Sequence, residues 1–187
     1  MLSASALCQD STSRQHSTAL LFTYDGDFFG RLGALHWLSD NYAIVGQLAF
    51  DLVRTEPYYG PGGWQRKFSV GPVLELQRVL YCHDVLDLAI LARYAPDYTS
   101  TSFEYSDQQQ SETTGSFSWR HSISVGLRVH VALTTRLTLS GTHTISWVYD
   151  ETRHKRNPYF TGPYSTETLF RRGIAADTGE LALLFYL

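Results

Sequence analysis

The chain has 187 residues, of which 43% are hydrophobic, 14% aromatic and only 18% charged. This composition excludes intrinsic disorder, and a formal net charge of -3 gives no reason to expect a nucleic-acid partner. The length fits one domain, and the longest apolar run, residues 181–187, is far short of the ~20 residues of a membrane helix. Only Lys67 and Lys155 are lysines, which indicates that little of the surface faces water.

The N-terminal segment, residues 1–15, reads as the residual end of a signal peptide followed by a tail. Ala4-Ser5-Ala6 has the small-x-small pattern of a signal-peptidase site, although an ordinary Ser/Ala-rich terminus would look the same. Cys8 and Cys82 are the two cysteines, and either a disulfide or two thiols would fit. The remaining residues, 16–187, form the predicted domain.

Alternation of apolar and polar residues predicts β-strands along this whole domain. In chain order the expected strands are residues 16–25, 28–38, 42–52, 68–77, 86–94, 117–133, 137–150 and 165–187, eight if the last segment is one strand. The pattern is strictest in residues 116–150, where odd positions are apolar on both sides of a tight turn at 134–136. Pro72 cannot donate a ladder hydrogen bond, so a bulge or local break is expected there.

Two kinds of connection alternate between these strands. Short ones fall at residues 39–41, 81–84 and 134–136, and longer polar ones at 56–63, 96–114 and 151–163, with residues 25–27 as a brief turn on the long-loop side. Consecutive strands joined in this way predict an all-β, antiparallel up-and-down barrel.

The polar face distinguishes a membrane barrel from a soluble one. It carries Ser, Thr, Gly and Ala with isolated charges, which suits the crowded interior of an eight-stranded barrel. The apolar face ends in aromatic residues that predict a girdle at one membrane interface: Trp64, Phe68, Tyr94, Tyr98, Phe117, Trp119, Trp147 and Tyr149. We therefore expect the small residues to face the lumen and the apolar residues to face lipid.

On these strands and turns the chain resembles the small eight-stranded outer-membrane barrels of bacteria, the group with the OmpA membrane domain, OmpX and the opacity-type adhesins. The resemblance is architectural and covers nearly the whole chain. It implies a transmembrane barrel in the bacterial outer membrane, with short periplasmic turns and longer extracellular loops. Members of the group usually end in Phe or Trp, whereas this chain ends Phe185-Tyr186-Leu187. No functional site of the group is carried over.

Charged residues on the lumen face are expected to pair, because a single buried charge is costly. The predicted network consists of Glu75, Asp87, Arg93, Arg120, Arg128 and Glu180. A closed polar plug is the expected role, and a gated proton or ion path is the alternative. An open solute pore is not expected from eight strands.

Basic residues gather near the long-loop rim, where lipopolysaccharide presents phosphates. Contact with such phosphates is a hypothesis for Arg153, Lys155, Arg156, Arg171 and Arg172, and a solvated basic loop is the alternative. The neighbouring loop is acidic, with Asp97, Glu104, Asp107 and Glu112, and would dock the basic one or bind a partner.

The function expected from the sequence is non-enzymatic: a structural or surface-binding role through the loops, with outer-membrane lipids and lipopolysaccharide as partners. One alternative is a subunit of a larger envelope assembly, since Gly46, Gly141 and His143 interrupt outward apolar rows. The other is a lipid A hydrolase of the PagL type, but His121 with Ser124, and His143 with Ser146, are three apart and point to opposite faces. No cofactor and no metal site is expected, because neither cysteine lies in a ligand set.

Overall fold

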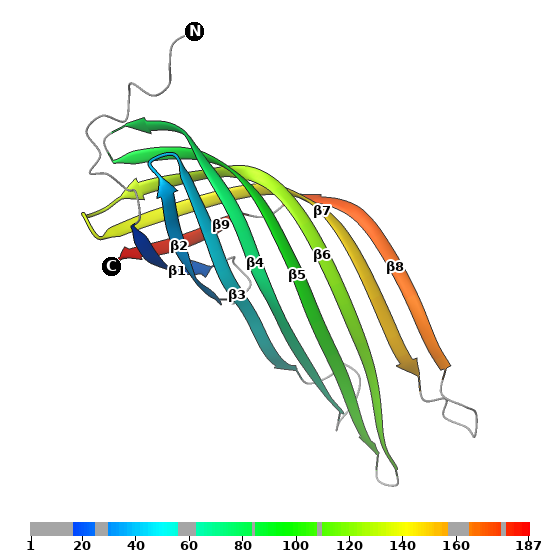
Figure 1. Cartoon of the computed structure of the whole chain (residues 1–187). Coiled ribbons are helices and arrows are strands. Elements are labelled where there is room, and N and C mark those ends of the chain that lie inside the picture. Colours follow the sequence, from blue (N-terminus) through cyan, green and yellow to red (C-terminus); the bar gives the residue numbers. More distant parts are fainter. Residues whose placement is uncertain are drawn as a thin grey trace.

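The computed structural model describes residues 17–24, 30–55, 63–83, 85–107, 110–156, 165–176 and 179–187. These residues form one antiparallel sheet, whose strands Figure 1 labels in chain order. The strands are β1 (Thr18–Tyr24), β2 (Gly30–Ser39), β3 (Tyr42–Thr55), β4 (Gly63–His83), β5 (Leu86–Asp107), β6 (Gln110–Ala132), β7 (Leu137–Arg156), β8 (Ser165–Ala176) and β9 (Glu180–Tyr186). Throughout this part of the chain, no helix is long and apolar enough to cross a membrane.

The sheet closes on itself into a barrel. Each strand from β1 to β7 pairs with the next, and β9 pairs with both β7 and β1. β8 and β9 lie end to end along β7, β8 on residues 145–156 and β9 on residues 137–142. The expected single strand 165–187 is therefore divided in two, with Gly179 in a positive-φ conformation (96°) before β9. The ring still has eight strand positions, as the sequence predicts.

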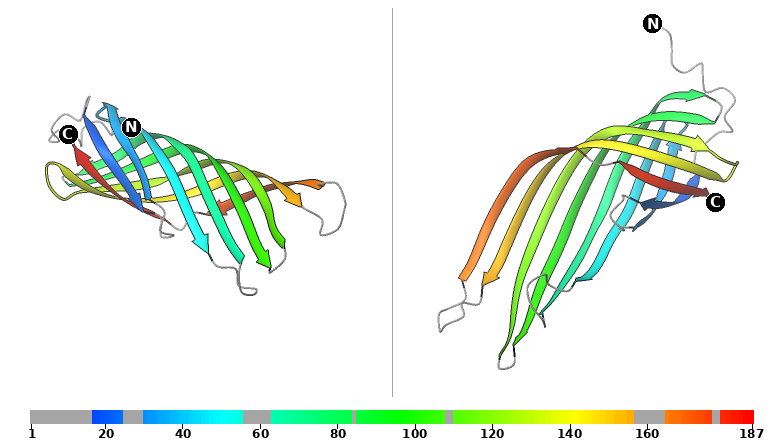
Figure 2. Two further views of the ribbon diagram at one scale, coloured as in Figure 1. Left: turned by 90° about the horizontal axis from the view of Figure 1, so that it is seen from below. Right: turned by 180° about the vertical axis from the view of Figure 1, so that it is seen from behind.

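Closure is confined to one half of the molecule. β1 and β2 are short, with 7 and 10 residues, whereas β5 and β6 have 22 and 23. Beyond the β1–β2 hairpin, β3 to β8 continue as a curved six-stranded sheet, which Figure 2 shows sweeping away from the closed end. We call this the extended sheet; it comprises residues 50–55, 63–70, 98–107, 110–119, 151–156 and 165–170.

The extended sheet is formed largely by segments that the sequence predicts to be long loops. Much of the predicted connection 96–114 is an antiparallel ladder that pairs Pro96 with His121 and continues to Asp107 with Gln110. β7 likewise runs to Arg156 within the predicted loop 151–163. Pairing satisfies the backbone groups of these polar segments. In stretches such as residues 99–102 and 151–156 the side chains on both faces are polar, so no alternation marks them as strands.

The ladder between β4 and β5 is interrupted at Pro72, as expected. Pairing stops at Val70 with Tyr98 and resumes in the same register at Leu74 with Tyr94, which places Pro72 opposite Pro96. Neither proline has a backbone N–H to donate. The β3–β4 ladder continues through Pro72 without a shift. The result is a local break in a single ladder.

Side-chain burial follows the predicted alternation. On β6, Val125, Leu127 and Val129 are exposed, whereas Ser124, Arg128 and His130 are buried. The same two-residue period holds on β3, β4, β5, β7 and β9. The outer surface of the closed part is thus a band of large apolar side chains, and the polar side chains line the lumen.

Candidate functional site

The lumen at the short-turn end is filled by an apolar layer. Its largest member, Trp37 on β2, is 1% exposed and its indole Nε1 donates to the hydroxyl of Tyr186 at 3.4 Å. The layer contains Ala19, Leu21, Leu35, Trp37, Ala43, Val45, Val79, Cys82, Ala182 and Leu184. These side chains pack against one another and are buried from solvent.

Above the apolar layer, Glu75 on β4 binds two arginines from neighbouring strands. Arg128 on β6 lies 2.5 Å from one carboxylate oxygen of Glu75 through Nη1, and Arg93 on β5 donates from Nε to the other at 2.9 Å. Gln77 donates to Glu75 at 2.6 Å, and Arg128 Nε donates to Thr142 on β7 at 2.6 Å. The Glu75 carboxylate therefore has charged and neutral donors around it, which offsets the cost of its burial.

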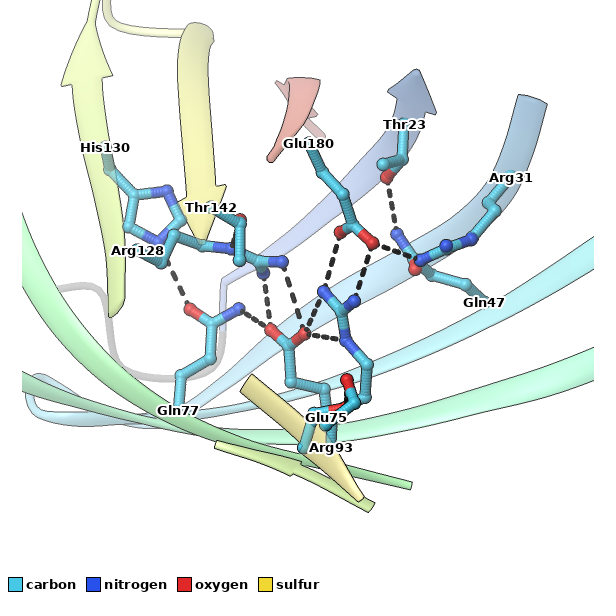
Figure 3. Close-up of polar contacts among 12 residues, drawn as sticks. Thr23, Arg31, Gln47, Glu75, Gln77, Arg93, Arg128, His130, Thr142 and Glu180 are labelled. Carbon is cyan, nitrogen blue, oxygen red and sulfur yellow. Dashed lines mark hydrogen bonds and ion pairs between the residues drawn. The ribbon is translucent and has the colours of Figure 1, made fainter. Parts of the chain in front are cut away.

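Arg93 also connects Glu75 to a second carboxylate across the lumen. Its two terminal nitrogens donate to the two oxygens of Glu180 on β9, at 2.6 and 2.7 Å, in a bidentate pair. Arg31 on β2 binds the same Glu180 at 2.7 Å. Figure 3 shows this chain of contacts crossing the barrel from one wall to the other.

Every strand position of the ring contributes a side chain to this layer. Gln47 on β3 donates to Thr23 on β1 at 2.7 Å, and His130 Nε2 lies 3.1 Å from the side-chain oxygen of Gln77. We call the whole layer the lumen plug: Thr23, Arg31, Gln47, Glu75, Gln77, Arg93, Arg128, His130, Thr142 and Glu180. Together with the apolar layer it closes the barrel.

Of the six charged residues expected in the lumen network, four meet in the plug: Glu75, Arg93, Arg128 and Glu180. Asp87 is buried in the lumen nearer the short-turn end, opposite Cys82 and His130 in the ladders. Arg120 lies farther along β6 and pairs with Asp150 at 3.4 Å, with its side chain 56% exposed. Its distance from the plug follows from its place in the wider, open part of the barrel.

The plug also contains Arg31, Gln77 and His130, which the sequence does not predict as members of the network. Arg31 lies in the strand with the weakest alternation, so its face could not be assigned. His130 and Gln77 are on the polar faces of well-predicted strands, and their facing positions across the lumen depend on barrel closure. The sequence signal for both residues is that each occupies an inward-facing position in the alternation of its strand.

A cavity of about 260 Å³ opens above the plug toward the extended sheet. Charged residues of both signs line it: Arg31, Asp51, Lys67, Asp97 and Arg120. The ladders place Asp97, Arg120, Asp150 and Arg171 in one row on β5, β6, β7 and β8, so charges alternate in sign along the concave face. This face is polar and accessible from the open end.

Asp150 belongs to this concave row and lies beyond the roughly 9–11 residues of β7 that a membrane crossing needs, counted from Leu137. Partial burial alone would raise the pKa of Asp150, but the hydrogen bond from Ser118 and the charge of Arg120 outweigh it and lower the pKa. Thr152 also donates to this carboxylate at 3.3 Å. The carboxylate therefore stays ionised to lower pH than an isolated aspartate.

The aromatic girdle is present on the outward face near the open end. Tyr98 contacts Trp119 with ring centroids 4.8 Å apart, and Tyr149 contacts Phe170 at 6.3 Å. The side chain of Trp64, also expected in the girdle, lies outside the described residues. Aromatic rings at the rim of an apolar band are typical of a membrane interface.

The expected basic cluster is divided between the two faces of the sheet. Arg172 stacks over the outward Tyr149 at 5.9 Å, whereas Arg171 pairs in register with Asp150 on the concave face. Arg153 binds Glu151 at 2.8 Å. The side chains of Lys155 and Arg156, and those of Glu104, Asp107 and Glu112, lie outside the described residues. Arg171 and Arg172, two of the five expected residues, therefore lie on opposite faces of the sheet.

The two His–Ser pairs point to opposite faces, as the spacing predicts. His121 faces outward and its Nδ1 lies 2.9 Å from the hydroxyl of Tyr94, whereas Ser124 contacts Ser146 inside the lumen at 2.7 Å. His143 is likewise exposed on the outside. Neither histidine can therefore act as a base for its serine.

Cys82 is buried near the short-turn end, and Cys8 lies outside the described residues, as does the predicted signal-peptide end. The disulfide stays a prediction. Within the described ranges, no group of three or more His, Cys, Asp or Glu side chains could hold a metal ion.

The chain matches no protein-family model and no curated protein sequence. It is similar to a solved major outer membrane protein of Thermus thermophilus, with a TM-score of 0.63 and 10% identity over 91% of this chain and 98% of that one. Two other solved structures are CarO of Acinetobacter baumannii (TM-score 0.43, 8% identity, 92% and 98% covered) and Ail of Yersinia pestis (0.42, 10%, 91% and 94%).

At 10% identity, the similarity to the Thermus protein shows the fold. The closed antiparallel ring, the outward apolar band and this likeness define a small transmembrane β-barrel of the outer-membrane type. The sequence-based assignment to that group is confirmed at the level of architecture.

Proposed function

We propose that this protein is a closed, non-enzymatic barrel of the bacterial outer membrane that binds partners at the cell surface through its extended sheet. One observation carries the proposal: the lumen is closed by the plug and the apolar layer, while six strands continue beyond the membrane band as a sheet with a charged concave face. The short turns face the periplasm in this arrangement, and the extended sheet is extracellular.

Closure of the lumen favours surface binding over transport. An open pathway would require three arginines and two glutamates to separate inside the barrel, each leaving a partner unpaired. In planar bilayers we expect the purified protein to give no steady single-channel current. A reproducible current across many insertions would contradict the closed-barrel proposal.

Binding through the extended sheet is tested with a shortened β5–β6 hairpin. Ser100 and Phe117 are directly paired, so replacing residues 101–116 by an Asn-Gly turn closes the hairpin at that pair. Cells that produce the full chain should adhere more to protein-coated, cationic or anionic surfaces than cells with the shortened chain. Equal adhesion at equal surface amounts would show that the β5–β6 part of the sheet is not the binding surface.

The hydrolase alternative has no support from the His–Ser pairs, because each pair lies on two faces of the sheet. Release of acyl chains from lipid A by the purified protein would overturn the non-enzymatic assignment. A subunit role would appear as a second protein that stays bound during purification in mild detergent.

A further inference from the structure

The outer surface carries a groove of about 610 Å³ across β3 to β6. Its outward lining residues are apolar apart from the hydroxyl of Tyr94 at one end: Ile44, Gly46, Leu74, Leu76, Ala92, Tyr94 and Ile123. A Cβ added at Gly46 would meet no atom within 4 Å, so the hollow is open at this residue. Its volume lies within the roughly 300–1,000 Å³ of small-molecule sites. The lipid-facing wall thus contains a preformed apolar depression.

The end of the groove toward the extended sheet is polar. Tyr94 and His121 stack with ring centroids 6.3 Å apart, and their hydroxyl and Nδ1 atoms lie 2.9 Å from each other. His121 is the next outward residue on β6 after Ile123, which lines the groove. The groove therefore leads directly to an outward-facing imidazole.

A guanidinium lies in the same row of the sheet as this imidazole. The ladders align His121 with Tyr149 and Tyr149 with Arg172, and Arg172 stacks over the Tyr149 ring at 5.9 Å. Among the described residues, nothing hydrogen-bonds Nε2 of His121. Ionisable side chains on a lipid-facing surface are costly without a partner. Both groups lie at the level of the aromatic girdle, where lipid headgroups lie.

We propose that the groove and its polar end form a binding site for one phosphorylated glycolipid of the lipid A type. Phosphate groups of the headgroup accept hydrogen bonds from His121 Nε2 and from the Arg172 guanidinium, and an acyl chain fills the groove past Gly46. Guanidinium and imidazole N–H groups match phosphate oxygens, and a hydrogen bond to the charged phosphate is charge-assisted. The inference rests on the proposed function in one respect: it requires the extended end to face the outer leaflet.

Native mass spectrometry of the detergent-solubilised protein tests the site with three probes: bisphosphorylated lipid A, enzymatically dephosphorylated lipid A, and phosphatidylglycerol. Lipid A should bind one to one. Loss of its phosphates removes both charge-assisted hydrogen bonds and should weaken binding by about a hundredfold, at about tenfold for each bond. Phosphatidylglycerol should bind more weakly than lipid A. Equal binding of phosphorylated and dephosphorylated lipid A would overturn the proposal.

Two pairs of variants locate the site. His121→Phe should weaken lipid A binding by about tenfold, whereas His143→Phe, on the same outer surface but away from the groove, should leave it unchanged. Gly46→Leu should fill the groove and weaken binding, whereas Gly141→Leu at another outward glycine should not. Equal effects within each pair would contradict the site.

The controls separate this inference from the proposed function. Each variant is first shown to be folded by its faster migration on gels before heating. If the wild type is folded and non-conducting but does not bind lipid A, the lipid site is wrong and the closed-barrel proposal stands. If a protease added on the periplasmic side cleaves the extended sheet, the proposed orientation is wrong. If Gly46→Leu releases a bound protein and leaves lipid A binding intact, the groove is a protein interface and the lipid proposal is wrong.

Discussion

Arg93 is the residue on which most of the lumen plug depends, because it binds Glu75 and both oxygens of Glu180. Its removal leaves two buried carboxylates each with one arginine fewer. In the folded barrel, neither carboxylate can regain water without opening the plug.

Arg93→Leu should therefore destabilise the barrel by about 3–5 kcal/mol. The matched control is Arg153→Leu, because Arg153 and Glu151 form an exposed pair in which the arginine side chain is 62% exposed. That control should cost less than about 1 kcal/mol. Urea unfolding in lipid vesicles measures both, and similar losses would mean that the plug does not stabilise the barrel.

Asp150 gives a pH-dependent prediction at the open end. Because its pKa is lowered in the folded state, ionised Asp150 stabilises the protein above the usual aspartate pKa of 3.8. That stabilisation is lost as the pH falls through the lowered folded-state pKa. Asp150→Asn should thus be less stable than the wild type at pH 7, and the difference should shrink below pH ~4. A difference that is constant across this range would contradict the assignment.

Two glycines on opposite faces of the sheet should respond differently to an added methyl group. A Cβ at Gly126 would lie 2.2 Å from the carbonyl oxygen of His143, whereas one at Gly46 meets open space. Gly126→Ala should therefore cost about 1–3 kcal/mol through overpacking, and Gly46→Ala should change stability by less than about 0.5 kcal/mol. Vesicle unfolding distinguishes these outcomes, and a well-tolerated Gly126→Ala would contradict the observed strand approach.

At the scale of elements, the closed half and the extended sheet have separate roles. β1 has 7 residues and β2 has 10, against about 9–11 for a strand that crosses a membrane. Among the described residues, β3 beyond Ala49 pairs with β4 alone. The shortened β5–β6 hairpin described above should therefore still fold, with the heat-dependent gel shift of the full chain. Loss of that shift would mean that the extension is needed to form the barrel.

How much of this architecture is readable from sequence differs between the two halves. Within the membrane band one face meets lipid and the other the lumen, so alternation at Val125, Leu127 and Val129 predicts strand and face together. Beyond it, residues 99–102 place Thr and Ser on both faces, so residues 98–107 look like a loop although they form a ladder. The contact of Arg31 with Glu180 joins strands far apart in sequence, and parity along one strand cannot predict it.

For the whole molecule, the central claim is that the odd positions of β6 face lipid while the even positions line a closed lumen. Nitroxide labels at single positions from Trp119 to Val131, in vesicles and with Cys8 and Cys82 replaced by serine, test it directly. Oxygen accessibility should alternate with a period of two, high at positions such as Val125 and Leu127 and low at Ser124 and Arg128. High accessibility of Val125 and Leu127 to a water-soluble nickel chelate, or no alternation along the strand, would contradict it.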